Sequence, residues 1–262
     1  MGIPYTWEEG LLILAFTMIL LLIVILISLY KKLGIGKEFA YAILKGGGQL
    51  FIIALFLTIL FRTNYWYLLI WLLLGTMILV GGYTSAKRAT HMPQAYQVTT
   101  PAILAGAALS LIVLAVSRAM PLEPQFIVPL SGMAFGNSMA ICSLTMERLI
   151  REIKLNKPAI ETMLSLGASS KQSLEPFQRL TIRASLIPTI DRLKTLGIIF
   201  IPGAMAGLLI AGTDPILAAE YQIIVYLMIV GGGIITALIT TSLSRKKLFN
   251  SNEQLDDWIY EL

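Results

Sequence analysis

Long apolar runs constrain this chain more than any other feature. Several stretches approach the ~20 residues that a helix needs to cross a ~30 Å hydrocarbon core, and the first runs from about Leu11 to Leu29. Only 13% of the residues are charged, whereas soluble domains carry about a quarter. A helix also satisfies its own backbone hydrogen bonds in lipid. The sequence therefore predicts an all-α integral membrane protein.

The apolar runs predict a bundle of about seven transmembrane helices. We place them near residues 10–30, 39–61, 66–85, 101–120, 125–145, 193–212 and 221–243. Residues 1–262 are interpreted as a single transmembrane domain. Its predicted cytoplasmic parts are a connecting loop, 146–192, between spans five and six, and a tail, 244–262.

The basic residues predict how the chain is oriented. With these spans, all lysines and arginines except Arg62 and Arg118 fall on one side. Basic residues collect in cytoplasmic loops, so the amino terminus is predicted outside and the carboxyl terminus inside. The net charge of +5 is then a topology signal rather than a nucleic-acid signal. We expect a multi-pass protein of the cell (inner or plasma) membrane, with the lipid bilayer and no nucleic acid as a partner.

Residues 157–176 of the cytoplasmic loop predict two short helices joined at a glycine. Pro158 suits the first turn of a helix, because its missing N–H would be unpaired there. Gly167 suits the left-handed conformation that ends a helix. Ser169 or Ser170 can then cap the next helix. We call this predicted helix–glycine–helix unit the elbow.

The elbow carries a motif that resembles a known one. Glu161 is followed by Gly167, Ala168 and Ser169, which resembles the E-x5-G-A-S signature in the cytoplasmic loop of ABC-transporter permeases. Thr162 and Met163 stand where that family usually has two alanines. The resemblance implies that the elbow is a coupling helix for a separate ATPase. The implied coupling residues are Glu161, Leu164, Gly167, Ala168 and Ser169.

A wider resemblance covers most of the chain. Residues 127–137 (IVPLSGMAFGN), 183–191 (RASLIPTID) and 202–222 (PGAMAGLLIAGTDPILAAEYQ) are similar to bacterial iron-export permeases, which are related to plant aluminium-sensitivity transporters. This implies a homodimeric permease subunit of an ABC exporter that moves metal ions (iron-like) or a related solute out of the cytoplasm.

The sequence has no G-x4-G-K-[ST] phosphate loop. We therefore expect ATP and Mg on the partner ATPase, no cofactor on this chain and no enzymatic activity of its own.

Polar groups inside the membrane are candidates for a transport pathway, because they are costly there unless paired or hydrated. The candidates are Gln49, Ser131, Asn137 and Ser138. Asn137 ranks first, since its amide needs a second helix or water. The alternative is that these residues only hold helices together.

Small residues indicate where helices approach closely. Gly132 and Gly136, and again Gly203 and Gly207, have the four-residue spacing of close helix contacts. Such a contact could form within the chain or across a dimer.

Metal ligands are a further possibility. Met133, Met139 and Cys142 offer soft ligands, whereas Glu147 and Asp191 offer the oxygen that iron or aluminium prefers. The alternatives are apolar filling for the sulfur residues, and ion pairs with Arg148, Arg183 or Arg192 for the carboxylates.

Two other functions stay open at this point. A stand-alone secondary transporter or channel predicts a carboxylate at mid-membrane and an internal repeat, and neither is evident in the sequence. A membrane scaffold that docks a cytoplasmic partner through the elbow would need no transport at all.

Overall fold

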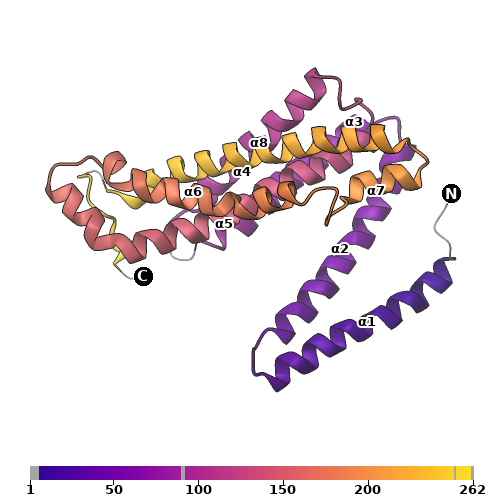
Figure 1. Cartoon of the computed structure of the whole chain (residues 1–262), viewed down its shortest axis with the longest axis horizontal. Coiled ribbons are helices and arrows are strands. Elements are labelled where there is room, and N and C mark those ends of the chain that lie inside the picture. Colours follow the sequence, from indigo (N-terminus) through magenta and orange to yellow (C-terminus); the bar gives the residue numbers. More distant parts are fainter. Residues whose placement is uncertain (1–5, 90–91, 251, 261–262) are drawn as a thin grey trace. The chain divides into compact units, whose positions relative to one another are not determined.

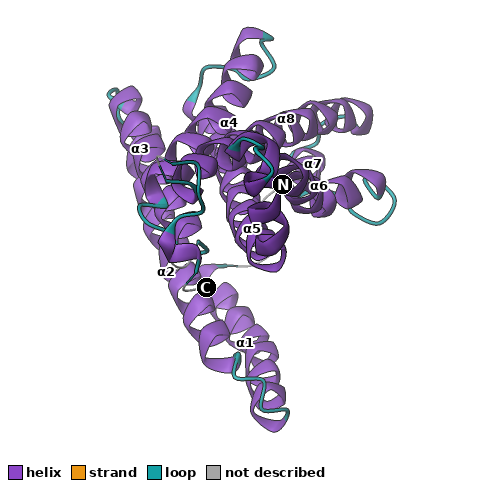
Figure 2. Cartoon of the chain, turned by 90° about the vertical axis from the view of Figure 1, so that its left-hand side faces the viewer, coloured by secondary structure: helices purple, strands orange, loops and turns teal. Residues whose placement is uncertain are grey.

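The computed structural model describes residues 6–89, 92–250 and 252–260. The regular structure of this part is helical throughout, as Figure 2 shows, apart from two isolated β-bridges. The sequence shows no partner for His91, so we expect it to be solvated; it lies outside the described residues. The helices are α1 Trp7–Tyr30, α2 Gly36–Arg62, α3 Trp66–Ala86, α4 Tyr96–Val116, α5 Pro124–Ser165, α6 Ser170–Lys194, α7 Gly203–Ile210, α8 Pro215–Leu248 and a 3-10 helix, η1, Asp257–Ile259.

The chain divides after Trp66 into two compact units. In the first, α1 and α2 form a helical hairpin. Thr6 and Glu9 form a reciprocal capping box at the start of α1. The Ser28 hydroxyl accepts a hydrogen bond of 2.9 Å from the Gly36 backbone N–H where α2 begins. A capping box therefore starts α1, and a hydrogen bond from the start of α2 back to α1 ties the two helices of the hairpin together.

In the second unit, α8 packs along α4 and α5, and α6 packs against both α5 and α8 (Figure 1). Helices α4 and α8 approach closely at Gly106 and Gly232. A Cβ built on Gly106 would lie 2.5 Å from the Gly232 carbonyl oxygen. Ser110 adds hydrogen bonds to the carbonyls of Gly106 and Met228, at 2.8 and 3.2 Å. Small residues thus bring the two backbones together.

Six of the helices are long and apolar enough to cross a membrane: α1, α2, α3, α4, α5 and α8. They contain the predicted spans other than the one near 193–212, although α4 ends at Val116 instead of 120. Arg118 has a φ of +60°, which is outside the helical region and ends the helix earlier than hydropathy indicated.

The prediction of one continuous helix over 193–212 is wrong. Helix α6 ends at Lys194, and the chain resumes helical structure only in α7, which has eight residues. Gly197 between them has a φ of +80°, and Pro202 is the N-cap of α7 with extended backbone. A left-handed glycine and a proline without an N–H interrupt the helical hydrogen bonds here.

Residues 146–192 are also more regular than the predicted cytoplasmic loop. Helix α5 continues through its apolar part to Ser165, with a kink at Asn156, whose φ is −111° and ψ 16°. Helix α6 then has 25 residues rather than forming a short second helix. Pro188 lies inside α6 without ending it. The segment is therefore a long helical hairpin with the elbow at its turn.

Candidate functional site

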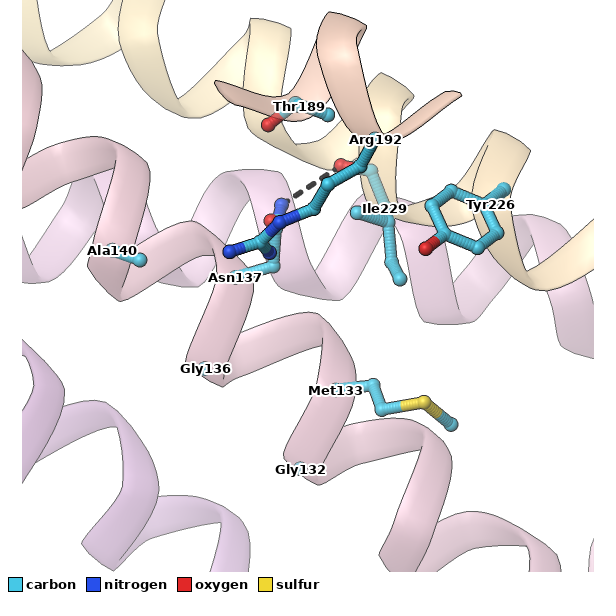
Figure 3. A pocket seen from close by; sticks show the side chains of 9 residues that line it. All are labelled: Gly132, Met133, Gly136, Asn137, Ala140, Thr189, Arg192, Tyr226 and Ile229. Carbon is cyan, nitrogen blue, oxygen red and sulfur yellow. Dashed lines mark hydrogen bonds between the residues drawn. The ribbon is translucent and has the colours of Figure 1, made fainter. Parts of the chain in front are cut away.

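A pocket of about 330 Å³ opens between α5, α6 and α8 (Figure 3). Helix α5 contributes its small-residue face, including Gly132 and Gly136, and α6 and α8 contribute larger polar side chains. The lining residues are Gly132, Met133, Gly136, Asn137, Ala140, Thr189, Arg192, Tyr226 and Ile229.

Asn137 joins two walls of this pocket. Its Nδ2 donates a hydrogen bond of 2.9 Å to the Ile229 carbonyl on α8, drawn as a dashed line in Figure 3. Asn137 is partly buried, and an amide withdrawn from water needs such partners. Helix α8 is thus the second helix that this amide was predicted to need. Its Nδ2 would also lie 3.2 Å from a Cβ on Gly233, so glycine leaves room for the amide.

Arg192 is the one charged residue among the nine that line the pocket. It extends from α6 toward the same space as Asn137 (Figure 3) and is exposed. Thr189, one turn earlier on α6, and Tyr226 on α8 add hydroxyl groups and are both mostly buried. This pocket can therefore offer hydrogen bonds and one positive charge to an oxygen-rich or anionic group.

The other predicted pathway residues lie elsewhere. Ser131 and Ser138 are almost fully buried on α5, and their hydroxyls have no hydrogen-bond partner among the described residues. Gln49 is exposed on α2, in the first unit. Of the four predicted residues, only Asn137 lines the pocket. A transport role for the other three stays a prediction.

The five predicted metal ligands do not converge. Met133 faces the pocket, Met139 packs near Gly81 on α3, and the Cys142 sulfur lies 3.4 Å from the Thr240 hydroxyl of α8. Glu147 forms an ion pair with Arg151, at 3.1 Å, rather than with the expected arginines, and Asp191 is exposed. In the described part of the chain, no three His, Cys, Asp or Glu side chains could hold a metal together.

The predicted packing glycines also find little to pack against within the chain. A Cβ on Gly136, Gly203 or Gly207 would meet no described atom within 4 Å, and one on Gly132 would only reach the Met77 methyl group. The close contacts are instead at Gly82, Gly106, Gly232 and Gly233. Contact of Gly132, Gly136, Gly203 and Gly207 with a second copy of the chain remains a prediction.

The elbow has the local structure that its sequence predicted. Gly167 has a φ of +88°, and it ends α5 with two hydrogen bonds, from Gly167 N–H to the Leu164 carbonyl and from Ala168 N–H to the Met163 carbonyl. This pair of bonds is a Schellman motif. Ser169 then caps α6 in a reciprocal box with Gln172.

The turn of the elbow is accessible, although most of the predicted coupling residues are half-buried. Leu166, at its tip, is 82% exposed, and Gly167 is also exposed. Glu161 is half-buried and accepts a hydrogen bond of 2.7 Å from the Tyr260 hydroxyl. That bond raises the pKa of Tyr260, with smaller effects from burial and from the charges of Glu161 and Asp257. The phenol therefore stays protonated and keeps donating at neutral pH.

Comparison with known proteins decides the family. The family described as "Uncharacterised protein family (UPF0014)" matches residues 11–249. The chain belongs to the UPF0014 family. This match runs from α1 to the residue after α8, and so includes both the pocket and the elbow.

Several known proteins are similar to this chain over nearly their whole length. The "UPF0014 membrane protein STAR2" of Oryza sativa subsp. japonica is 32% identical over 99% of this chain and 92% of its own length. The "Probable iron export permease protein FetB" of Escherichia coli (strain K12) is 33% identical over 92% of this chain and 93% of its own. The "Protein ALUMINUM SENSITIVE 3" of Arabidopsis thaliana is 30% identical over 96% of this chain and 92% of its own length. No solved structure matches this chain.

These findings confirm the family that the sequence motifs indicated, and they confirm a multi-pass membrane protein. Sequence reasoning missed Arg192 and Tyr226 as neighbours of Asn137. Arg192 stood out only as a possible ion-pair partner, and Tyr226 stood in an apolar run. Neither position carries a local signal that would place it beside α5.

Proposed function

We propose that this chain is the membrane permease subunit of an ATP-driven ABC exporter that moves metal ions (iron-like) or a related solute out of the cytoplasm. The observation that carries the proposal is the accessible elbow between α5 and α6, with Glu161 and Gly167 in the spacing of the coupling signature. The name of the Escherichia coli relative, a probable iron export permease, supports the direction and the solute class.

In this proposal the chain supplies no ATP chemistry, and a separate cytoplasmic ATPase binds ATP and Mg. The chain works as a homodimer, with its amino terminus outside and its carboxyl terminus inside. Helices α6 and α7, with the break between them, make the seventh crossing. Non-helical backbone at membrane depth is tolerated where protein or a water-filled cavity surrounds it, so this break is a candidate gate.

The first experiment tests whether the chain binds an ATPase. The purified protein should co-purify with a soluble ABC ATPase from its own cell, and Glu161→Arg should reduce the recovered ATPase about tenfold or more, since a reversed charge at an interface costs several kcal/mol. Glu220→Arg makes the same charge reversal at a control site, because Glu220 is exposed and lies near the start of α8, at the other end of that helix from the basic residues. Absence of any bound ATPase would favour a stand-alone carrier or a scaffold instead.

The charge of Arg192 gives a second prediction, on the form in which a metal travels. A lining whose charged residue is an arginine repels a bare cation and favours a metal complex with anionic ligands. We expect Arg192→Glu to lower export of such a complex about tenfold, since reversing an exposed charge changes the interaction by roughly 1–2 kcal/mol. Arg192→Lys keeps the charge and should retain most activity. Faster export by Arg192→Glu in metal-loaded vesicles would show that the bare ion is carried.

A further inference from the structure

The carboxyl-terminal segment folds back against the end of the chain that holds the elbow (Figure 1). We call residues 249–250 and 252–260 the tail segment. Its anchor is apolar: Phe249, Leu255, Trp258 and Ile259 are all buried. The Trp258 indole N–H donates a hydrogen bond of 3.0 Å to the Lys247 carbonyl at the end of α8. The tail segment is thus part of the core of this unit.

Three polar contacts join the tail segment to the elbow helices. The Glu253 carboxylate accepts a 2.8 Å hydrogen bond from the backbone N–H of Ser170, in the first turn of α6. The Tyr260 hydroxyl donates to Glu161. The Lys157 ammonium lies over the Tyr260 ring, 3.5 Å from its centroid. Each contact reaches a residue of the elbow. The hydrogen bond from Tyr260 reaches Glu161, the glutamate of the motif that resembles the coupling signature.

A groove of about 480 Å³ lies between the elbow and the tail segment. Its lining residues are Glu161, Leu164, Ser165, Asn250, Gln254, Leu255, Asp257 and Tyr260. Both charged residues in this lining, Glu161 and Asp257, are acidic, and the exposed Leu166 lies next to Ser165. The groove therefore matches a basic side chain flanked by apolar surface.

We propose that the elbow and the tail segment together form the surface that binds the ATPase subunit, with the groove accepting a basic side chain of that partner. This inference rests on the proposed function. A tail that instead blocks the elbow would have to leave when the partner binds. Removing four buried apolar side chains from the core costs about 1.5–3 kcal/mol each, so the contacts favour a permanent platform.

The test uses the full chain, reconstituted in lipid nanodiscs, and the dissociation constant of its ATPase. Asp257→Lys reverses the charge of an exposed groove residue and should weaken binding about tenfold, with a smaller dependence on salt than the wild type shows. Glu220→Lys, an exposed site outside the groove, is the matched control and should bind normally. The thermal midpoint of each variant without ATPase should stay at the wild-type value, which separates a binding effect from unfolding.

Tyr260→Phe tests whether the tail segment acts through Glu161. It removes the hydroxyl and keeps the ring over Lys157. We expect about threefold weaker binding, and no further loss when it is added to Glu161→Gln, because neighbours in one hydrogen-bond network are not additive.

The outcomes separate the two proposals. If the wild type binds the ATPase and the Asp257 and Tyr260 variants bind equally well, the platform is overturned and the permease assignment stands. Tighter binding by these variants would overturn the platform in favour of a competing tail. If the wild type binds no ATPase, the proposed function fails and the platform fails with it.

Discussion

Gly232→Leu should abolish recovery of the folded protein, whereas Gly231→Leu should leave it intact. A Cβ at Gly232 would lie 2.9 Å from the Gly106 carbonyl oxygen, which is backbone and cannot rotate away. Overfilling a packed interior costs about 1–3 kcal/mol and occasionally more, and a clash between two helix backbones belongs at the upper end. The measurement is the yield of monodisperse protein in detergent and its thermal midpoint.

Gly231 is a closely matched control because it is the preceding residue of the same helix. It is exposed, and a Cβ there would meet no described atom within 4 Å. Leucine also has a better helix propensity than glycine, by up to about 1 kcal/mol, so this variant should be neutral or slightly more stable. Equal yields from the two variants would show that α4 and α8 do not pack as described.

Gly167→Pro should reduce ATPase association more than tenfold, whereas Gly167→Asn should reduce it less than about threefold. Proline fixes φ near −65° and has no N–H, but Gly167 has a φ of +88° and its N–H donates to the Leu164 carbonyl. Proline therefore cannot form the turn between α5 and α6. An unfavourable change of about 1.4 kcal/mol in the elbow is already a factor of ten in binding.

Asparagine isolates the conformational requirement, because it adopts the left-handed region more readily than most residues and keeps the N–H. The measurement is the dissociation constant of the ATPase for each variant, alongside the thermal midpoint of the permease alone. If the proline variant bound as tightly as the wild type, the geometry of the elbow would be irrelevant to coupling.

The elbow was predictable because its signals are local. A glycine in the left-handed region and a serine capping box each act within a few residues, so Gly167, Ser169 and Gln172 determine the turn without help from distant parts of the chain. The six long apolar helices were predictable for a similar reason, since length and hydropathy alone decide whether a segment can cross a bilayer.

The sixth predicted span shows where hydropathy misleads. The segment Ile198–Ile201 is as apolar as a membrane helix, but Gly197 and Pro202 on either side of it interrupt the helix. Conversely, the polar composition of residues 146–192 predicts a loop, whereas α5 and α6 continue through this segment. Polarity reports the solvent around a segment, and a helix can continue from lipid into water.

The membrane class, most of the helix positions and the turn of the elbow follow from the sequence, because hydropathy and capping depend on residues close together in the chain. Helix packing, in contrast, brings Arg192 and Tyr226 to Asn137 around one pocket and brings Tyr260 to Glu161. It also decided which glycines pack closely. These contacts join residues far apart in sequence, and the side chains that meet are chosen by how whole helices pack.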